Sequence, residues 1–127
     1  MLRYEGCKGA PGMKEVMLST DALVGYGLHT SVGLVTDARF SGFNHGPIVG
    51  HICPEAYDGG PIALVEDGDI IIVDTVGGTI NVDLSDEELE NRRKVWVRPE
   101  PKVKTGVLAI YANTCLPADQ GGAMQFW

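Results

Sequence analysis

The sequence has no long apolar stretch: none of its hydrophobic runs approaches the roughly 20 residues that a membrane-spanning helix requires. Its amino terminus, "MLRYEGCKGAPG", also lacks the basic and then apolar segments of a secretory signal peptide. Basic residues are few, with 10 lysines and arginines against 17 aspartates and glutamates, and their densest run is "RRK" at Arg92–Lys94. These absences argue against a membrane protein and a nucleic-acid-binding protein, and they make the cytoplasm the expected location.

Cysteine is scarce and scattered. The chain has three cysteines, Cys7, Cys53 and Cys115, and no two of them form a C-x-x-C pair. An odd number in a chain expected to be cytoplasmic provides no disulfide framework, so small buried or half-buried thiols are expected. The three could ligate a cluster only if the fold brought them together.

The residues that are present indicate a single mixed domain. The chain has 127 residues, of which 44% are hydrophobic and 21% charged, which is typical of one globular domain, residues 1–127, with a buried core. Segments with helical and with strand-like patterns both occur, and two long Gly-rich polar segments interrupt them. The predicted fold class is therefore mixed α/β.

Local patterns predict several helices. Pro11 suits the first position of a short helix, and Ser85 with Glu88 has the spacing of a capping box. The helix after this box has acids in its first turn and bases in its last, as the helix dipole favours. The predicted helices cover residues 12–18, 20–28, 86–96 and 105–116.

The strand-like segments lie mainly in the middle of the chain. A buried strand is predicted over residues 31–36, and a short helical turn over 51–56. Residues 61–84 contain three β-rich runs, separated by the turn signals "EDGD" and "VGG". This spacing is typical of a meander or of the wall of a barrel.

The two Gly-rich polar segments are the candidates for function, because glycine lets a loop backbone approach a ligand closely. Carboxylates beside a glycine loop suggest a hard-cation or anion site, and a serine beside a basic residue suggests a nucleophile or a base. The alternative is that both loops only turn the chain, with Glu15 facing water from inside a helix. The candidates are Glu5, Lys8 and Glu15 in "EGCKGAPGMKE", and Arg39, Ser41, Asn44 and His45 in "RFSGFNHG".

Four stretches carry a family resemblance: "RYEGCKGAPGMKEV", "TDARFSGFNHGPIVGHICPEA", "GGPIALVEDGDIIIVD" and "LSDEELENRR". From Leu2 to about Arg93 the sequence resembles the carboxy-terminal domain of the dihydroxy-acid dehydratase and 6-phosphogluconate dehydratase family. The ending, "YANTCLPADQGGAMQFW", is more similar to the tail of sugar-acid dehydratases. The resemblance implies a swivelling β/β/α domain with a small barrel-like β core and outer helices, a closure that would leave no strand edge exposed.

The resemblance also implies a reaction. Members of this family remove water from a 2,3-dihydroxy carboxylate: a base takes the C2 proton, a Lewis acid assists loss of the C3 hydroxyl, and the enol product becomes a 2-keto acid. The implied cofactors are Mg²⁺ and an iron–sulfur cluster. The matching motifs "RFSG" and "APGMKE" assign the base, as an alkoxide, to Ser41 and a Mg²⁺ ligand to Glu15. Because a serine hydroxyl is only weakly acidic, it needs cationic neighbours such as Mg²⁺ for this role.

Other polar residues of the same loop have supporting roles under this resemblance. Arg39 could stabilise the alkoxide or bind the substrate carboxylate, and the alternative is a structural pair with Asp37 or another acid. His45 and His51 could shuttle a proton or contact sugar hydroxyls, and the alternative is hydrogen bonding to loop carbonyls. Asn44 is a further candidate for substrate binding.

The resemblance covers only part of a dehydratase. The family's cluster cysteines, its other Mg²⁺ ligands and a carbamylated lysine belong to a larger amino-terminal domain, which nothing in this sequence resembles. The implied partners are that domain, a small dihydroxy or sugar acid and, for the whole enzyme, further copies of itself. Met1 precedes "LRYEG", where the family domain begins, which suggests a truncated, incomplete or split chain. Cys7 replaces an expected proline, and Cys53 lies in "GHICPEA" where "GHVSPEA" is common.

Three hypotheses remain open at this point. The chain could be the half-site domain of a dehydratase, inactive alone. It could be a non-catalytic binding or regulatory module of the same fold, or an unrelated β-rich domain whose glycine loops are structural. The first hypothesis predicts that the Glu15 carboxylate and the Ser41 hydroxyl lie within roughly 10 Å of each other on one open face.

Overall fold

The computed structural model describes residues 1–42 and 44–125 and confirms a mixed α/β fold. Its helices and strands are short and are joined by long irregular segments. In chain order they are α1 (Met17–Gly25), β1 (Leu34–Val35), β2 (Ile48–Val49), the 3₁₀ turn η1 (Ala56–Asp58), α2 (Pro61–Leu64), β3 (Ile71–Asp74), β4 (Thr79–Val82), α3 (Asp86–Val95), α4 (Gly106–Thr114) and the 3₁₀ turn η2 (Ala118–Gln120).

The strands form two separate sheets. β1 and β2 are parallel, with Leu34 opposite Ile48, and β3 and β4 form an antiparallel hairpin with Ile71 opposite Val82. A parallel bridge between Leu2 and Thr36 extends the first sheet on the other side of β1. The strands of residues 1–42 and 44–125 therefore do not close into the barrel-like core that the resemblance implies.

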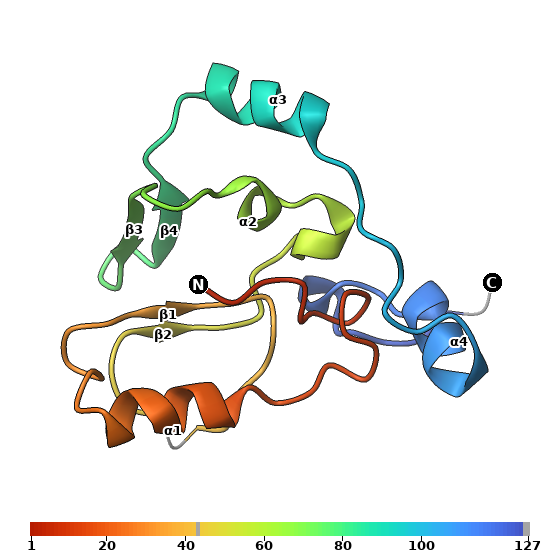
Figure 1. Cartoon of the computed structure of the whole chain (residues 1–127), viewed down its shortest axis with the longest axis horizontal. Helices are drawn as coiled ribbons and strands as arrows, with labels where there is room; N and C mark the ends of the chain where they lie inside the picture. Colours follow the sequence, from red (N-terminus) through yellow and green to blue (C-terminus); the bar gives the residue numbers. More distant parts are fainter. Residues whose placement is uncertain (43, 126–127) are drawn as a thin grey trace.

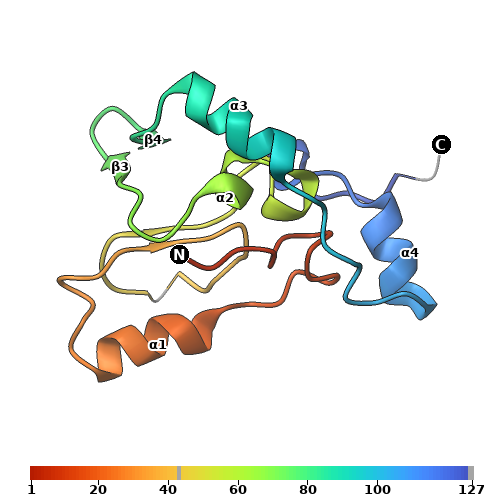
Figure 2. The ribbon, with the colours of Figure 1, turned by 45° about the horizontal axis from the view of Figure 1, so that its top comes forward.

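The β1–β2 sheet lies in the middle of the molecule (Figures 1 and 2). Helix α1 runs along one side of it, and α2 with α3 lies on the other. The β3–β4 hairpin and α4 are at opposite ends, and the amino terminus lies close to β1, on the side facing the hairpin and α2. The sheet therefore separates the loops near α1 from the hairpin layer.

The first helix differs from the prediction. A single helix, α1, replaces the two helices predicted over residues 12–18 and 20–28. Gly12 and Met13 have positive φ angles of 92° and 47°, which a right-handed helix cannot accommodate. Glu15 then pairs in extended conformation with Arg39, so the helix begins only at Met17.

The segment 61–84 is only partly β. Its first run, "PIALV", is the helical turn α2, with Pro61 at the first helical position and Ile62 and Leu64 buried. Proline suits that position because its missing N–H would have no partner there. The other two runs form the β3–β4 hairpin, with the predicted turn "VGG" between them. The predicted turn "EDGD" lies before β3, and in it the Glu66 amide donates to the Asp69 carboxylate at 2.7 Å.

The two later helices are confirmed. In α3 the Ser85 hydroxyl accepts a hydrogen bond from the Glu88 amide at 3.2 Å, which is the predicted cap. The Glu88 carboxylate does not complete the capping box, since it accepts from Arg92 Nε at 2.8 Å. Helix α4 occupies most of the predicted segment 105–116.

The buried core is small and divided. One cluster consists of Cys7, Met13 and Cys115, and the other of Ala56, Ile62 and Ala63. Large aliphatic side chains remain exposed on α1, on the hairpin and on α4, among them Leu18 at 83% and Val107 at 74%. Of the helices in the described residues, none has the length and apolar character to cross a membrane.

Candidate functional site

A backbone bridge joins the two segments that the sequence singled out. Glu15 and Arg39 pair in a parallel bridge, and the Val16 amide donates to the Arg39 carbonyl at 2.9 Å. Paired backbones are about 4.8 Å apart and two residues extend at most about 7 Å, so the Cα atoms of Glu15 and Ser41 lie within about 12 Å. The bridge thus brings the "APGMKE" and "RFSG" motifs side by side.

The Glu15 and Arg39 side chains are both exposed, while Ser41 is half-buried. Across residues 1–42 and 44–125 the Glu15 carboxylate has neither a hydrogen bond nor an ion pair. Glu15 lies before helix α1 and not inside it, because its backbone is extended in the bridge. An exposed carboxylate without a protein partner beside an irregular polar loop is available to an external ligand.

Arg39 is not held by Asp37. Its guanidinium Nη2 lies 3.5 Å from the Met13 sulfur. The oxygens of Asp37 instead accept backbone hydrogen bonds from Tyr4, at 3.1 Å, and from Glu5 and Ala56, at 3.0 and 2.9 Å. Asp37 is therefore not the partner of Arg39, and among the described residues Arg39 forms no ion pair with another acid either. The exposed guanidinium can bind an anion.

Asn44 has a structural contact in the same loop. Its side-chain amide donates a hydrogen bond to the carbonyl of Ser41. This bond restrains the Ser41 carbonyl. Asn44 therefore shapes the loop, in addition to any role in substrate binding.

The two loop histidines lie in different places. The His45 ring is edge-on to that of His29, with centroids 6.5 Å apart, and it lines an open hollow of about 330 Å³ together with Asp21 of α1. His51 is exposed, has a left-handed φ of 55°, and donates its amide to the Ala38 carbonyl at 3.0 Å. His45 thus borders a cavity that could admit a small polar molecule, and His51 belongs to the backbone frame.

Two buried carboxylates organise the amino-terminal glycine loop, and sequence reasoning did not identify either. Asp37 is 1% exposed, and its three backbone hydrogen bonds join the first loop to η1. Glu55 is 5% exposed and accepts the Lys8 and Gly9 amides on the same oxygen, at 2.9 and 2.7 Å. A Cβ at Gly6 would overlap the Glu55 carboxylate, so only glycine fits there.

Burial dominates the electrostatics of this loop. It raises the pKa of Glu55 above its ordinary value, although the Gly9 and Lys8 amides partly offset the effect. The Lys8 side chain is not free for a ligand, because its ammonium lies 2.6 Å from the Asp58 carboxylate. Lys8 is therefore a structural cation, and Glu55 is a buried acid that anchors backbone.

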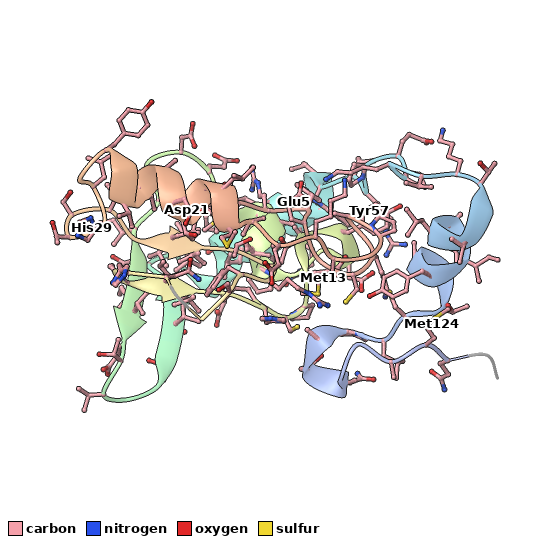
Figure 3. All side chains as sticks on the ribbon, turned by 90° about the horizontal axis from the view of Figure 1, so that it is seen from below. Glu5, Met13, Asp21, His29, Tyr57 and Met124 are labelled. Atoms are coloured by element: carbon pink, nitrogen blue, oxygen red, sulfur yellow. The ribbon has the colours of Figure 1, made fainter. Side chains whose placement is uncertain are left out.

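The fold brings Cys7 and Cys115 together. Both are buried beside Met13, with the Cys7 thiol 3.5 Å from the Met13 sulfur. Burial raises the pKa of Cys115 to about 11 and that of the neighbouring Tyr111 to about 12. Met13 lies near the middle of the molecule, as Figure 3 shows. The Cys115 thiol therefore stays protonated near neutral pH, and both cysteines are buried, as the sequence predicted.

The described residues could supply one ligand to a Mg²⁺ site, but not a complete set. Within residues 1–42 and 44–125, no three His, Cys, Asp or Glu side chains come together as metal ligands. Mg²⁺ prefers six oxygen ligands, some of them water, and Glu15 could provide one of these. An iron–sulfur cluster requires several cysteine thiolates, and the buried cluster of this fold contains two cysteines, Cys7 and Cys115, without Cys53.

Comparison with known proteins gives a consistent result. Residues 1–122 match the family described as dihydroxy-acid/6-phosphogluconate dehydratase C-terminal. The chain is 52% identical over 124 residues to a dihydroxy-acid dehydratase of Metallosphaera sedula, covering 98% of this chain and 22% of that protein. It is 55% identical over 113 residues to one from Synechococcus sp., covering 89% and 20%.

A third relative extends the same pattern. The dihydroxy-acid dehydratase of Syntrophotalea carbinolica is 53% identical over 121 residues, covering 95% of this chain and 22% of that protein. The chain thus spans about a fifth of the length of these relatives. On the match over residues 1–122, the chain belongs to the dihydroxy-acid/6-phosphogluconate dehydratase C-terminal family.

Proposed function

We propose that this chain supplies, to a larger hydro-lyase, the part of the active site that takes the C2 proton from a 2,3-dihydroxy carboxylate. Loss of the C3 hydroxyl then gives an enol, which tautomerises to a 2-keto acid. The observation that carries the proposal is the Glu15–Arg39 bridge, which sets an exposed carboxylate beside the loop of Ser41. The names of the relatives support the reaction class. The chain alone has no activity under this proposal.

In the proposed reaction Ser41 acts as the base in its alkoxide form, and its oxygen takes the C2 proton to become the neutral hydroxyl. Arg39 binds the substrate carboxylate, because its guanidinium is exposed and is not paired with Asp37. Glu15 would provide one oxygen ligand to Mg²⁺, and the charge of a divalent ion held by this carboxylate would favour the alkoxide form of serine. His45 borders the hollow beside α1 and contacts the hydroxyls of the substrate, while Asn44 holds the backbone of the loop.

The rest of the enzyme supplies what this chain lacks. We assign the remaining Mg²⁺ ligands and the iron–sulfur cluster to the amino-terminal part of the enzyme, because no three His, Cys, Asp or Glu side chains of residues 1–42 and 44–125 come together as metal ligands. The whole enzyme is proposed to be a cytoplasmic homo-oligomer. The names of the relatives favour a dihydroxy acid as substrate over the sugar acid suggested by the carboxy-terminal sequence.

The test uses a full-length enzyme that contains this region. Ser41→Ala is expected to lower kcat by at least about 100-fold with a small change in KM, because it removes the base and leaves the binding groups. Exchange of the C2 proton with deuterated solvent should fall in parallel. The control is Ser31→Ala, which removes an exposed hydroxyl whose hydrogen bond is to the Leu28 carbonyl. Activity of Ser41→Ala within tenfold of the control would contradict the proposal.

A second variant tests the metal ligand separately. Glu15→Gln should raise the Mg²⁺ concentration required for half-maximal activity, because a neutral amide binds a hard cation more weakly than a carboxylate does. The matched control, Glu87→Gln, removes an exposed carboxylate in the first turn of α3. An unchanged Mg²⁺ requirement in Glu15→Gln would remove Glu15 from the site.

A further inference from the structure

Three sulfur atoms meet in the buried cluster of Cys7, Met13 and Cys115. These side chains are 2%, 3% and 4% exposed, and the Cys7 thiol donates a hydrogen bond to the Met13 sulfur at 3.5 Å. Burial is the main cause of the raised pKa of Cys115, and the charge and the side-chain hydrogen bond of Cys7 are further causes. Cys7 therefore lies within hydrogen-bonding reach of both other sulfurs. The proposed reaction uses none of the three.

The cluster joins two parts of the fold that are far apart in the sequence. Cys7 and Met13 belong to the amino-terminal glycine loop, and Cys115 is the first residue after α4. Gly122 lies over the Cys7 sulfur, since a Cβ at this glycine would be 3.7 Å from it. Figures 1 and 2 show the segment after α4 beside the amino-terminal loop. The fold therefore encloses the sulfurs between these two segments.

The kind and spacing of these ligands select one class of metal. Thiolate and thioether sulfurs are soft ligands, which favour Cu(I). Mg²⁺ prefers oxygen ligands, and structural Zn²⁺ sites take four ligands from Cys, His and carboxylates. A metal–sulfur distance of about 2.3 Å places three sulfurs around one ion roughly 4 Å apart. The Cys7–Met13 distance of 3.5 Å thus has to open by only roughly half an ångström.

We propose that Cys7, Met13 and Cys115 form a binding site for one Cu(I) ion. Each cysteine gives up its thiol proton and forms one bond to copper through the resulting thiolate, while the Met13 thioether donates a lone pair as third ligand. Two protons leave and no electron is transferred, because copper enters as Cu(I). This proposal does not depend on the reaction proposed above.

The surroundings of the cluster suit such a complex. Cu(I) with two thiolates carries one negative charge, and a buried charge is costly unless an opposite charge lies near it. The Arg39 guanidinium, 3.5 Å from the Met13 sulfur, provides the opposite charge. Met124 lies opposite Cys115 in an antiparallel bridge and is 39% exposed. Side chains directly opposite each other lie on the same face, so Met124 offers copper a sulfur at the surface beside the cluster.

The test titrates Cu(I), in the absence of oxygen, into the reduced 127-residue chain with the colorimetric chelator bicinchoninate as competitor. One Cu(I) per chain should be withdrawn from the chelator. Cys7→Ser and Cys115→Ser should each weaken binding by more than about 100-fold, because loss of a residue that only supports a metal ligand already costs about 10–100-fold. The matched control is Cys53→Ser, because Cys53 is half-buried and lies outside the cluster. Affinities of the two cysteine variants within tenfold of this control would overturn the proposal.

Met13→Leu tests the thioether separately. Leucine has nearly the same volume as methionine, so the variant should stay folded. Its affinity for Cu(I) should fall by less than in the cysteine variants, because the two thiolates remain. X-ray absorption at the copper edge should show three sulfur neighbours in the parent chain and two in the variant. The same number of sulfur neighbours in both proteins would remove Met13 from the site and overturn the proposal.

Measurements on the unchanged chain cover the case in which a cysteine variant does not fold. Binding should release two protons per copper, measured with a pH indicator in unbuffered solution, and the affinity should therefore rise with pH. The thermal midpoint should rise with the concentration of Cu(I), because the ion binds the folded chain. An equal concentration of Zn²⁺ should leave the copper in place. Binding without proton release, or displacement of copper by zinc, would overturn the proposal.

Discussion

Replacing Asp37 by asparagine tests whether the amino-terminal loop depends on one buried carboxylate. Asp37 Oδ2 accepts the Tyr4 and Ala56 amides, and Oδ1 accepts the Glu5 amide at 3.0 Å. If the asparagine oxygen replaces Oδ2, the bonds from the Tyr4 and Ala56 amides are kept. The asparagine NH₂ group then replaces Oδ1 and faces the Glu5 amide, so that two donors oppose each other. The substitution changes almost no volume, so it perturbs the hydrogen bonds and the charge of the acceptor without creating a cavity.

The expected loss follows from that geometry. A hydrogen bond to a charged acceptor contributes about 1.5–3 kcal/mol, and a buried donor left unpaired costs about 1–3 kcal/mol. Because these two effects overlap, the free energy of unfolding should fall by about 2–4 kcal/mol. A domain with a total stability of about 5–15 kcal/mol should remain folded after such a loss. Asp37→Ala leaves three amides without this acceptor and should be close to unfolded.

Urea denaturation of the 127-residue chain, followed by tryptophan fluorescence, measures this loss. The Trp96 indole donates to the Tyr4 hydroxyl at 3.1 Å, so it reports on the loop that Asp37 holds. Asp67→Asn is the matched control, because Asp67 is exposed in the turn before β3. If Asp37→Asn unfolds within about 0.5 kcal/mol of this control, which is typical of surface changes, then Asp37 does not anchor the loop.

Two further predictions concern buried ionisable groups. Burial raises the pKa of Glu55, because it disfavours the charged carboxylate. The stability that the protonated Glu55 side chain contributes is therefore fully present below pH 4.5, its ordinary pKa, and is lost as the pH rises through the raised pKa. Glu55→Gln should abolish this pH dependence, because glutamine does not titrate. The variant should therefore become more stable relative to the parent chain as the pH rises through the raised pKa of Glu55. Parallel curves of stability against pH for the two proteins would contradict the prediction. Cys53 is half-buried, so in the native protein it should react with a maleimide faster than the buried Cys7 and Cys115. In urea the three cysteines should react at similar rates. Equal rates in the native protein would contradict the difference in burial.

The elements that the sequence predicted well are those determined by neighbouring residues. The cap of α3 depends on Ser85 and on an amide three positions later, and the hairpin turn depends on glycines within it. The helix predicted over residues 12–18 failed because Glu15 pairs with a residue 24 positions away, which no local pattern reveals. The run "PIALV" failed because four apolar residues after a proline suit a strand and a helical turn equally well.

The candidate site shows the same division. Glu15, Arg39 and Ser41 were singled out as candidates from their motifs, but their proximity results from a bridge that the sequence does not encode in any short pattern. Asp37 and Glu55 were missed because an acid after a strand or a proline is normally a surface residue. The signal that could have found them is the small residues nearby: Gly6 must lack a side chain because Glu55 fills that space.

The contact between the two motif segments is made by main chain, with the Val16 amide and the Arg39 carbonyl as partners. Main-chain partners are the same for almost every amino acid. Side chains at positions 15, 39 and 41 can therefore change while the two segments stay in place. Under the proposed function, such a main-chain frame would let new substrate preferences arise from point substitutions without a new fold.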